Sequence, residues 1–257
     1  MNIKVIVATH KAYTMPRDDM YIPVHVGRRL SDNWQNSALR SYTGDDSGDN
    51  ISGKNKNYCE LTGLYWAWKN LDCDYLGLAH YRRHFRRNKS KDKWQTILTK
   101  EKAESLLEKC DVILPKKRDY FIESTYEQYI HAHNKQDLDK TLEILQEKYP
   151  EYIPAWDKVM KSTSGHRFNM FIMKKEILDR YLEWLFDILF TLEEVLDISS
   201  YTPNDRRVFG FVSERLLDIW LITNNIGYTE LPVINMENQH WPKKIFNFLK
   251  RKFIGKK

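Results

Sequence analysis

Short apolar runs alternate along this chain with longer stretches in which apolar residues recur at helical spacing. This alternation constrains the fold more than any other feature, because strand and helix in turn build an α/β sheet of mostly parallel strands. The expected strands are 3–8, 74–79, 111–114, 166–173 and 231–234, and the expected helices are 58–71, 99–109, 123–148, 174–196 and 207–222.

Residues 12–57 break this alternation. They contain Pro16, Pro23 and several glycines among many polar residues, including the stretch TGDDSGDNISGKN. Such a composition predicts long irregular loops with little regular structure. Loops of this length inside a compact domain are more often functional than idle.

The cysteines and the apolar runs bear on the compartment. The three cysteines, Cys59, Cys73 and Cys110, lack metal-ligand spacing and their number is odd. This pattern favours a reducing cytoplasm over a disulfide framework and indicates no zinc site. The N-terminal apolar run is too short for a secretion signal, and no stretch approaches the roughly 20 apolar residues of a spanning helix.

The positive charge of the chain is concentrated at its end. Residues 243–257 hold seven basic and no acidic residues, so a net charge of +6 for the whole chain leaves −1 for the remainder. This argues against a nucleic-acid-binding body. The sequence predicts a main domain of residues 1–240. After it, residues 241–257 are predicted to form a basic amphipathic helix that binds an anionic membrane surface. A helix packed on the domain with a solvated basic face is the alternative.

A concentration of cations and rings follows the second expected strand, in YLGLAHYRRHFRR at 75–87. Ligands of open α/β sheets gather at the carboxyl ends of strands, which is where His80, Tyr81, Arg82 and Arg83 would lie. A guanidinium can hold phosphate oxygens with two parallel hydrogen bonds, so these arginines suit a diphosphate. The alternative is a solvated basic turn paired with surface acids.

Five segments together resemble the bacterial domain-of-unknown-function 4422 family. They are VATHK at 7–11, YIPVHVG at 21–27, the block of 43–70 containing GDNIS, YCELT and YWAWKN, GLAHYRRHF at 77–85 and FNMFIMKKEI at 168–177. The likeness covers about residues 3–241. It implies a GT-A-like, Rossmann-type sheet that holds a nucleotide-sugar donor at the strand ends, and a glycosyltransferase of capsule, exopolysaccharide or O-antigen synthesis, some members being galactofuranosyltransferase-like.

The resemblance also implies donor-binding residues. Thr9, His10 and Lys11 would meet the nucleoside and phosphate, and Asp49 and Asn50 belong to the block GDNIS. Enzymes of that fold commonly carry an Asp-x-Asp motif that holds a divalent cation, whereas this chain has His80, Tyr81, Arg82 and Arg83 at the corresponding strand end. Fixed arginines would then neutralise the leaving diphosphate.

No cofactor is firmly implied by this pattern. A divalent cation, Mn²⁺ or Mg²⁺, would need the acidic loop of Asp45, Asp46 and Asp49 to fold over the donor. For Asp45 and Asp46 a solvated turn is the better interpretation.

Transfer with inversion, the favoured stereochemistry, needs a general base for the acceptor hydroxyl. Glu214 and Asp205 are the candidates, by loose similarity to acceptor-side acids of this fold, although Asp205 also suits a helix N-cap and Glu214 an ion pair with Arg215. Asn169 and His133 are candidate acceptor contacts.

The leading hypothesis is a cytoplasmic enzyme, peripheral on the inner face of the membrane, that moves a hexosyl group from a UDP-sugar to a lipid-linked or polysaccharide acceptor. The donor sugar would be galactofuranose or another hexose. A noncatalytic polysaccharide-assembly partner or a basic nucleic-acid-binding module is the alternative.

Overall fold

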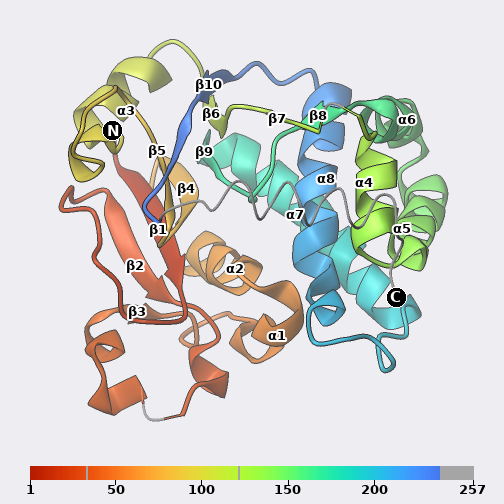
Figure 1. Ribbon diagram of the computed structural model, residues 1–257, viewed down its shortest axis with the longest axis horizontal. Helices are drawn as coiled ribbons and strands as arrows, with labels where there is room; N and C mark the ends of the chain where they lie inside the picture. The colour runs from red at the N-terminus through yellow and green to blue at the C-terminus, as the bar shows by residue number, and fades with distance from the viewer. Residues whose placement is uncertain (33, 121, 238–257) are drawn as a thin grey trace.

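The computed structural model describes residues 1–32, 34–120 and 122–237 of the chain. Seven strands form the main path of a central sheet, in the order β10, β6, β9, β4, β1, β2, β3 (Figure 1). They are β1 (Ile3–Thr9), β2 (Tyr21–His25), β3 (Thr43–Gly44), β4 (Tyr75–His80), β6 (Val112–Pro115), β9 (Phe171–Lys174) and β10 (Thr229–Leu231). Two further strands, β5 (Arg83–Phe85) and β11 (Val233–Asn235), pair with each other, and β5 also pairs with β4.

The sheet is mostly parallel, as the sequence predicts. β1 runs parallel to both β2 and β4, β2 to β3, and β6 to β10. β9 lies between β4 and β6 and runs antiparallel to both. Six of the seven strands of the main path therefore point the same way, and the amino end of β9 lies at the edge where the others end.

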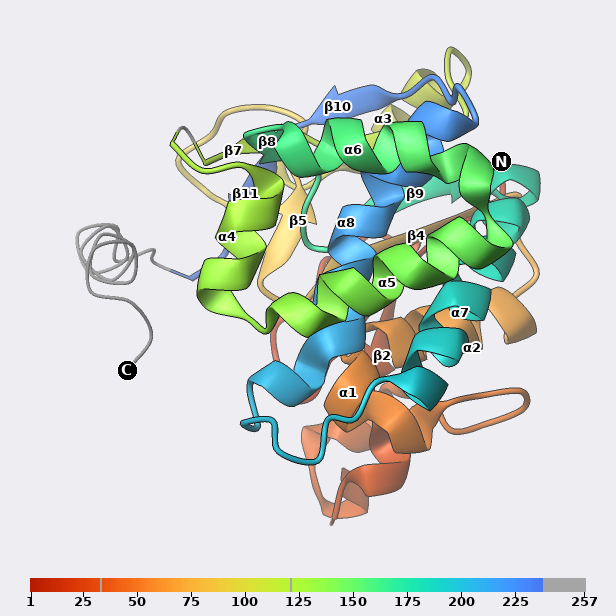
Figure 2. The same cartoon turned by 90° about the vertical axis from the view of Figure 1, so that its right-hand side faces the viewer.

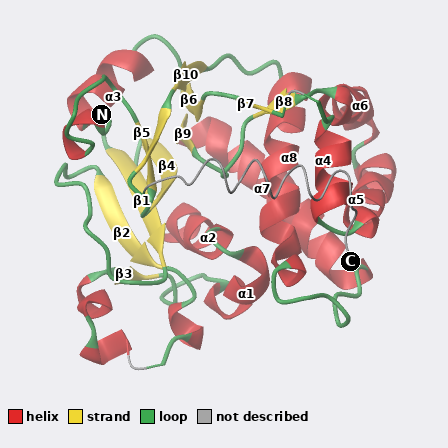
Figure 3. Ribbon diagram, viewed as in Figure 1, coloured by secondary structure: helices red, strands yellow, loops and turns green. Residues whose placement is uncertain are grey.

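Helices cover both faces of this sheet. They are α1 (Asn55–Tyr58), α2 (Leu61–Asn70), α3 (Lys100–Leu107), α4 (Thr125–Ala132), α5 (Lys135–Lys148), α6 (Ile153–Lys161), α7 (Lys175–Val195) and α8 (Val208–Thr223). Figure 3 shows the sheet on one side of the molecule and α4 to α8 gathered on the other. In Figure 2, α5 and α6 lie across α7 and α8, which they contact.

Two apolar cores hold these layers together. The larger core joins one sheet face, through residues such as Ile6, Leu76 and Leu78, to α2, α7 and α8. The smaller core covers the opposite face and includes Val5, Val7 and Ala103 of α3. Alternate side chains of β1 enter different cores because successive residues of a strand point to opposite faces.

The expectation of irregular structure over residues 12–57 is wrong in part. β2 lies within this stretch and pairs with β1 from Tyr21 to His25, and β3 extends the sheet by two residues. Pro23 conceals the strand in the sequence, because proline is unusual inside sheets. Here it is tolerated because the pairing with β3 begins only at Val24.

Three other segments differ from the prediction. YPEYIPAW was expected to end the helices at 148, but the chain turns once at Pro150–Tyr152 and continues as α6. Of 166–173 only the last three residues lie in a strand, β9, because Phe168 and Asn169 have positive φ angles of 77° and 54°. The expected strand 231–234 is divided at Pro232 into β10 and β11.

Asp45 holds the loops of residues 12–57 to the body of the protein. Its carboxylate is completely buried. The two oxygens accept hydrogen bonds from the backbone N–H groups of Gly27 (2.8 Å) and Arg28 (3.1 Å) and from the hydroxyls of Ser52 (2.5 Å) and Thr62 (2.6 Å). A buried carboxylate with four donors is a structural group, because its desolvation is compensated by hydrogen bonds.

We therefore expect Asp45→Asn to lower the free energy of unfolding by about 2 kcal/mol. The –NH₂ group of asparagine would replace one carboxylate oxygen, and its two N–H donors would then face the donor groups that this oxygen accepts from. Urea denaturation followed by tryptophan fluorescence measures this change. Asp46→Asn is the matched control, since Asp46 is exposed, and it should change stability little. Equal stability of the two variants would contradict the structural role of Asp45.

Within the described residues, no helix combines the length and apolar character needed to cross a membrane. The basic segment predicted to meet a membrane, residues 241–257, lies outside the described residues.

Candidate functional site

The candidate site lies at the carboxyl edge of the sheet. β1 ends there at Thr9 and β4 at His80, and the turn after β4 carries Arg82. The amino end of β9 brings Asn169 to the same edge, since this strand runs in the opposite direction. The start of α8 lies beside these strand ends, since the Asn169 amide donates a hydrogen bond of 3.2 Å to the Gly210 carbonyl of α8.

Arg83 is the cation of this edge that most needs an anion. Its guanidinium stacks over the Phe168 ring, with 4.5 Å from Cζ to the ring centroid. Burial, and next the charge of Arg82, lower the pKa of Arg83. Within the described ranges this guanidinium forms no hydrogen bond and no ion pair. A partly desolvated cation that forms no direct ion pair is stabilised by a bound anion, so the geometry favours an anion site here.

Arg82 and Lys11 extend this positive surface but share one carboxylate. Glu237 lies 3.2 Å from Arg82 Nη1 and 4.0 Å from Lys11 Nζ. Arg82 is 40% exposed and its guanidinium also lies over the Tyr81 ring. The pair with Glu237 is therefore a solvated one, which an incoming phosphate can replace at little cost.

If the site takes the UDP-sugar that the sequence analysis expects, Glu237→Gln should tighten the binding of UDP about two- to fivefold, because it frees both cations and an exposed ion pair contributes little. Isothermal titration calorimetry with UDP at low ionic strength measures the effect, which added salt should reduce. Glu143→Gln breaks another exposed lysine–glutamate pair, with Lys140, and should leave UDP affinity unchanged. Weaker binding to the Glu237 variant would show that Glu237 does not compete with the ligand.

His10, His80 and Tyr81, which the sequence predicts to lie beside the donor, are close together at this edge of the sheet. His10 packs edge-on against Tyr81, with 5.5 Å between ring centroids. Burial lowers the pKa of His10, and the charges of Lys11 and Arg82 lower it further, so the ring is neutral at pH 7. His80 Nε2 lies 2.6 Å from the Phe168 carbonyl oxygen. His80 thereby ties the end of β4 to the loop before β9.

Thr9 has a structural role in the turn after β1. Its hydroxyl donates to the Lys11 carbonyl (2.6 Å) and accepts from the Lys11 N–H (3.2 Å). Thr9 is also buried. It therefore shapes the loop that presents His10 and Lys11.

Two carboxylates face the arginines. The charges of Glu214, on α8, and Glu60, between α1 and α2, both act on Arg83. Glu214 Oε2 accepts a hydrogen bond of 3.0 Å from Arg215 Nη1. Glu214 thus forms the ion pair with Arg215 that the alternative interpretation expects, although Arg215 itself is buried.

Glu60 is a site residue that the sequence analysis did not single out. The Asn169 amide donates a hydrogen bond of 2.8 Å to Glu60 Oε1, and a second of 3.2 Å to the Gly210 carbonyl. The Asn169 oxygen accepts from the Ser213 hydroxyl (3.0 Å). Asn169, a predicted acceptor contact, thus holds a carboxylate in place within the site.

Backbone strain is concentrated around these residues. Cys59, Phe168 and Asn169 account for three of the four positive φ angles of non-glycine residues in the described part of the chain. Such conformations cost free energy and persist where the surroundings enforce them, often at functional sites. Burial, then the Glu60 carboxylate, raise the pKa of Cys59 to about 11, so this residue stays a thiol at pH 7.

Asp205 and His133 lie at the periphery of the site and contact each other. His133 Nδ1 lies 3.5 Å from Asp205 Oδ1, and the Asp205 carboxylate accepts from the Thr202 hydroxyl (2.8 Å). The His133 ring stacks on Phe211, at 4.1 Å between centroids. Phe211 in turn lies under Arg207. Asp205 opens the turn before α8, in Asp205–Arg207, and is not the N-cap of α8.

Asp49 and Asn50 contact α2 and their own loop. The Asp49 carboxylate accepts from the Tyr65 hydroxyl at 3.5 Å, and its carbonyl accepts from the Asn70 amide at 2.8 Å. Asn50 donates to the Gly48 carbonyl. Their contacts within the described residues therefore do not reach the arginines.

A cation held by the acidic loop does not fit the geometry of Asp45, whose oxygens are already occupied by four donors. Among the described residues, no three histidine, cysteine, aspartate or glutamate side chains gather in a way that could hold a metal ion. The positive charge at this edge comes from arginine and lysine side chains.

The arrangement places fixed cations opposite two carboxylates across one strand edge. Arg83 and Arg82 can receive an anionic group, and Glu214 or Glu60 can accept a proton from a second molecule. The site thus combines anion binding with general base chemistry.

The family model found for this chain covers the arrangement apart from Glu237. A family model described as Domain of unknown function (DUF4422) matches residues 4–225. A solved structure titled as the apo form of WbbM, a bifunctional glycosyltransferase, is 32% identical, with a TM-score of 0.84 over 93% of this chain. The chain spans 46% of the length of that structure. No curated protein matches the chain.

Proposed function

Because the chain belongs to the DUF4422 family, we propose that it is a glycosyltransferase that moves a hexosyl group from a UDP-sugar to a saccharide acceptor. The similarity to WbbM supports this proposal, since it extends over 93% of the chain and so includes both sides of the site. The products would serve capsule, exopolysaccharide or O-antigen assembly. Galactofuranose is the donor sugar to test first.

The observation that carries the proposal is the guanidinium of Arg83 at the strand edge, which forms no hydrogen bond or ion pair among the residues that the structure describes. In the proposed reaction the bond between C1 of the sugar and the diphosphate oxygen breaks, and UDP keeps the electron pair. Arg83, together with Arg82 and Lys11, stabilises the negative charge that develops on the leaving group. In this proposal the arginine and lysine side chains neutralise the leaving diphosphate, which in enzymes with an Asp-x-Asp motif is the role of a bound metal ion.

Glu214 is the proposed general base. As the acceptor oxygen bonds to C1 from the opposite face, Glu214 takes the hydroxyl proton, and the configuration at C1 inverts. Glu60, held by the Asn169 amide, positions the acceptor hydroxyl. Asp205 is the weaker candidate because its contacts are with Thr202 and His133.

We place the enzyme at the cytoplasmic face of the membrane, with a lipid-linked acceptor. This follows from the basic and amphipathic sequence of residues 241–257, which we propose as a segment distinct from a catalytic domain of residues 1–240. Each cation near an anionic surface contributes about 1 kcal/mol of attraction.

A panel of UDP-sugars, tested by thermal shift and by release of UDP, tests the proposed function. A matching donor should raise the melting temperature, because a ligand of the native state stabilises it, and should slowly be hydrolysed. EDTA should change neither result if arginines carry the charge, whereas a metal-dependent enzyme would lose both. Binding without any UDP release would instead favour the noncatalytic polysaccharide-assembly partner.

The basic nucleic-acid-binding module makes a different prediction. Its binding to nucleic acid would be sensitive to salt and would survive deletion of residues 243–257.

A further inference from the structure

Two cavities lie outside the site described above, and the side chain of Trp94 lines both of them. The first has a volume of about 500 Å³ and the second of about 680 Å³. Thr14, Asp92 and Trp94 line both, so the cavities are two parts of one groove. Both volumes are in the range of small-molecule binding sites.

The second cavity leads to the arginine edge. It is lined by Tyr13, whose ring packs edge-on against Tyr81 at 5.0 Å between centroids. It is also lined by Met236, whose backbone N–H donates to the Arg82 carbonyl at 2.9 Å. Two residues that line the groove, Tyr13 and Met236, therefore contact residues of the proposed donor site.

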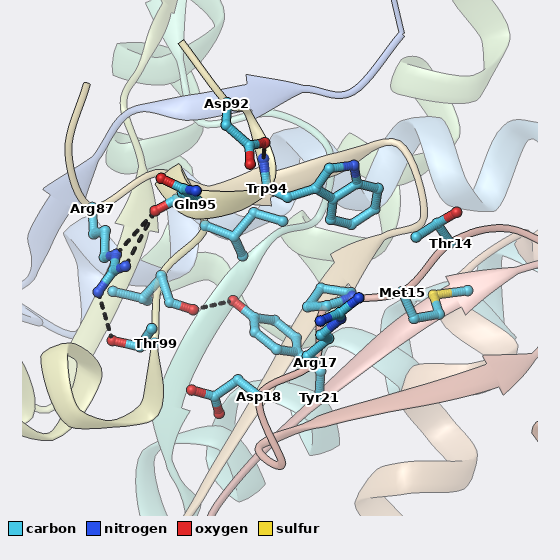
Figure 4. Close-up of a pocket in the computed structure, with 13 residues that line it drawn as sticks. Thr14, Met15, Arg17, Asp18, Tyr21, Arg87, Asp92, Trp94, Gln95 and Thr99 are labelled. Carbon is cyan, nitrogen blue, oxygen red and sulfur yellow. Dashed lines mark hydrogen bonds between the residues drawn. The ribbon is translucent and has the colours of Figure 1, made fainter. Parts of the chain in front are cut away.

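Trp94 presents its ring to this groove. The side chain is 37% exposed, which is unusual for a residue of its size. Its position is fixed locally, because its backbone N–H donates to Asp92 Oδ1 at 2.9 Å and it begins the short turn Trp94–Thr96. Figure 4 shows Trp94 and Asp92 on one side of the first cavity and Tyr21 and Asp18 on the other.

The polar lining of the first cavity suits an uncharged ligand rich in hydroxyl groups. Two arginines and two aspartates line it, so neither sign of charge is in excess. Arg87 donates to the Gln95 carbonyl and Asp18 accepts from the Lys100 N–H, and both side chains are thereby held in place. Hydroxyls both donate and accept, and this lining offers both kinds of partner. The donor edge, by contrast, presents the adjacent guanidinium groups of Arg82 and Arg83, which suit an anion.

We propose that this groove binds the acceptor glycan, with a sugar ring stacked on Trp94. An apolar ring face bordered by fixed donors and acceptors complements a sugar, which has apolar faces and hydroxyls around its rim. The inference rests on the proposed function, because it takes the ligand of the groove to be the acceptor of the transfer at the arginine edge.

The experiment uses the full chain, labelled with a fluorophore, on an array of bacterial surface oligosaccharides, followed by titration with the best-bound glycan. Trp94→Ala should weaken that affinity by at least about tenfold, and Trp94→Phe by less, since a ring remains. Tyr228→Ala is the matched control, because Tyr228 is also 37% exposed and does not line the groove. Melting temperatures verify that each variant is folded.

Equal affinity of the Trp94→Ala and wild-type proteins, or binding of no glycan, would overturn the proposal. Trp94-dependent binding of polyprenyl phosphate micelles without glycan binding would also overturn it, in favour of a lipid. Release of UDP by the wild-type protein is measured in parallel. If no UDP-sugar is consumed while glycan binding depends on Trp94, the proposed transferase function is wrong, but the groove is still a glycan-binding site.

Discussion

Arg83→Ala is expected to lower kcat/KM for the UDP-sugar by about 10²- to 10³-fold, the loss typical of removing one preorganised group that stabilises transition-state charge. The guanidinium is half-buried and stacks on Phe168, and it forms no direct ion pair in the described residues, although the charges of Glu214 and Glu60 act on it. Its charge is therefore available to the leaving diphosphate. Removing it should also lower affinity for UDP, because the product carries the same diphosphate.

Steady-state kinetics of UDP release and calorimetry with UDP measure the two effects. Arg83→Lys should recover part of the loss, since it keeps the charge but not the two-pronged geometry. Arg40→Ala is the control, because Arg40 is exposed and lies in the short helical turn Ala38–Ser41. Kinetics of Arg83→Ala within a few-fold of the wild type would remove the anion site from the mechanism.

Glu214→Gln is expected to lower kcat for transfer by about 10²- to 10⁴-fold, the usual contribution of a general base. Affinity for UDP should change little, because Glu214 does not contact the diphosphate in the proposed mechanism. The glutamine oxygen can still accept the hydrogen bond from buried Arg215, so the fold should be preserved. Rapid-quench measurement of a single turnover separates the chemical step from product release.

Two companion variants make this test specific. Glu60→Gln should raise KM for the acceptor more than it lowers kcat, if Glu60 only positions the hydroxyl. Asp205→Asn should change kcat less than Glu214→Gln, since Asp205 contacts Thr202 and His133. A larger loss of kcat for either companion would transfer the role of base to that residue.

The sequence predicts the framework of the sheet well because its central strands are buried on both faces. Val5–Ala8 and Tyr75–Ala79 are continuous runs without a charged residue for this reason, and the long helix α7 is nearly as clear from the helical spacing of its apolar residues. β2 is not recognisable, because Pro23 and the surrounding turn residues dominate local propensity. Its pairing with β1 is a tertiary effect.

The candidate site is predictable where residues are adjacent in sequence and not where distant segments meet. His80, Tyr81, Arg82 and Arg83 follow one strand, so their position at the edge can be read from the chain. Glu60 could not be identified in this way, because its partner Asn169 lies 109 residues later. The family block YCELT contains Glu60 and was the one available signal.

Asn169 illustrates how tightly backbone and chemistry together can restrict a position. With φ at 54°, residue 169 is readily occupied by glycine, asparagine or aspartate, and of these only asparagine has an amide to donate to Glu60. In directed evolution of this protein, we therefore expect almost no other residue type to be accepted at position 169. Changes of specificity would have to arise at neighbouring sites instead.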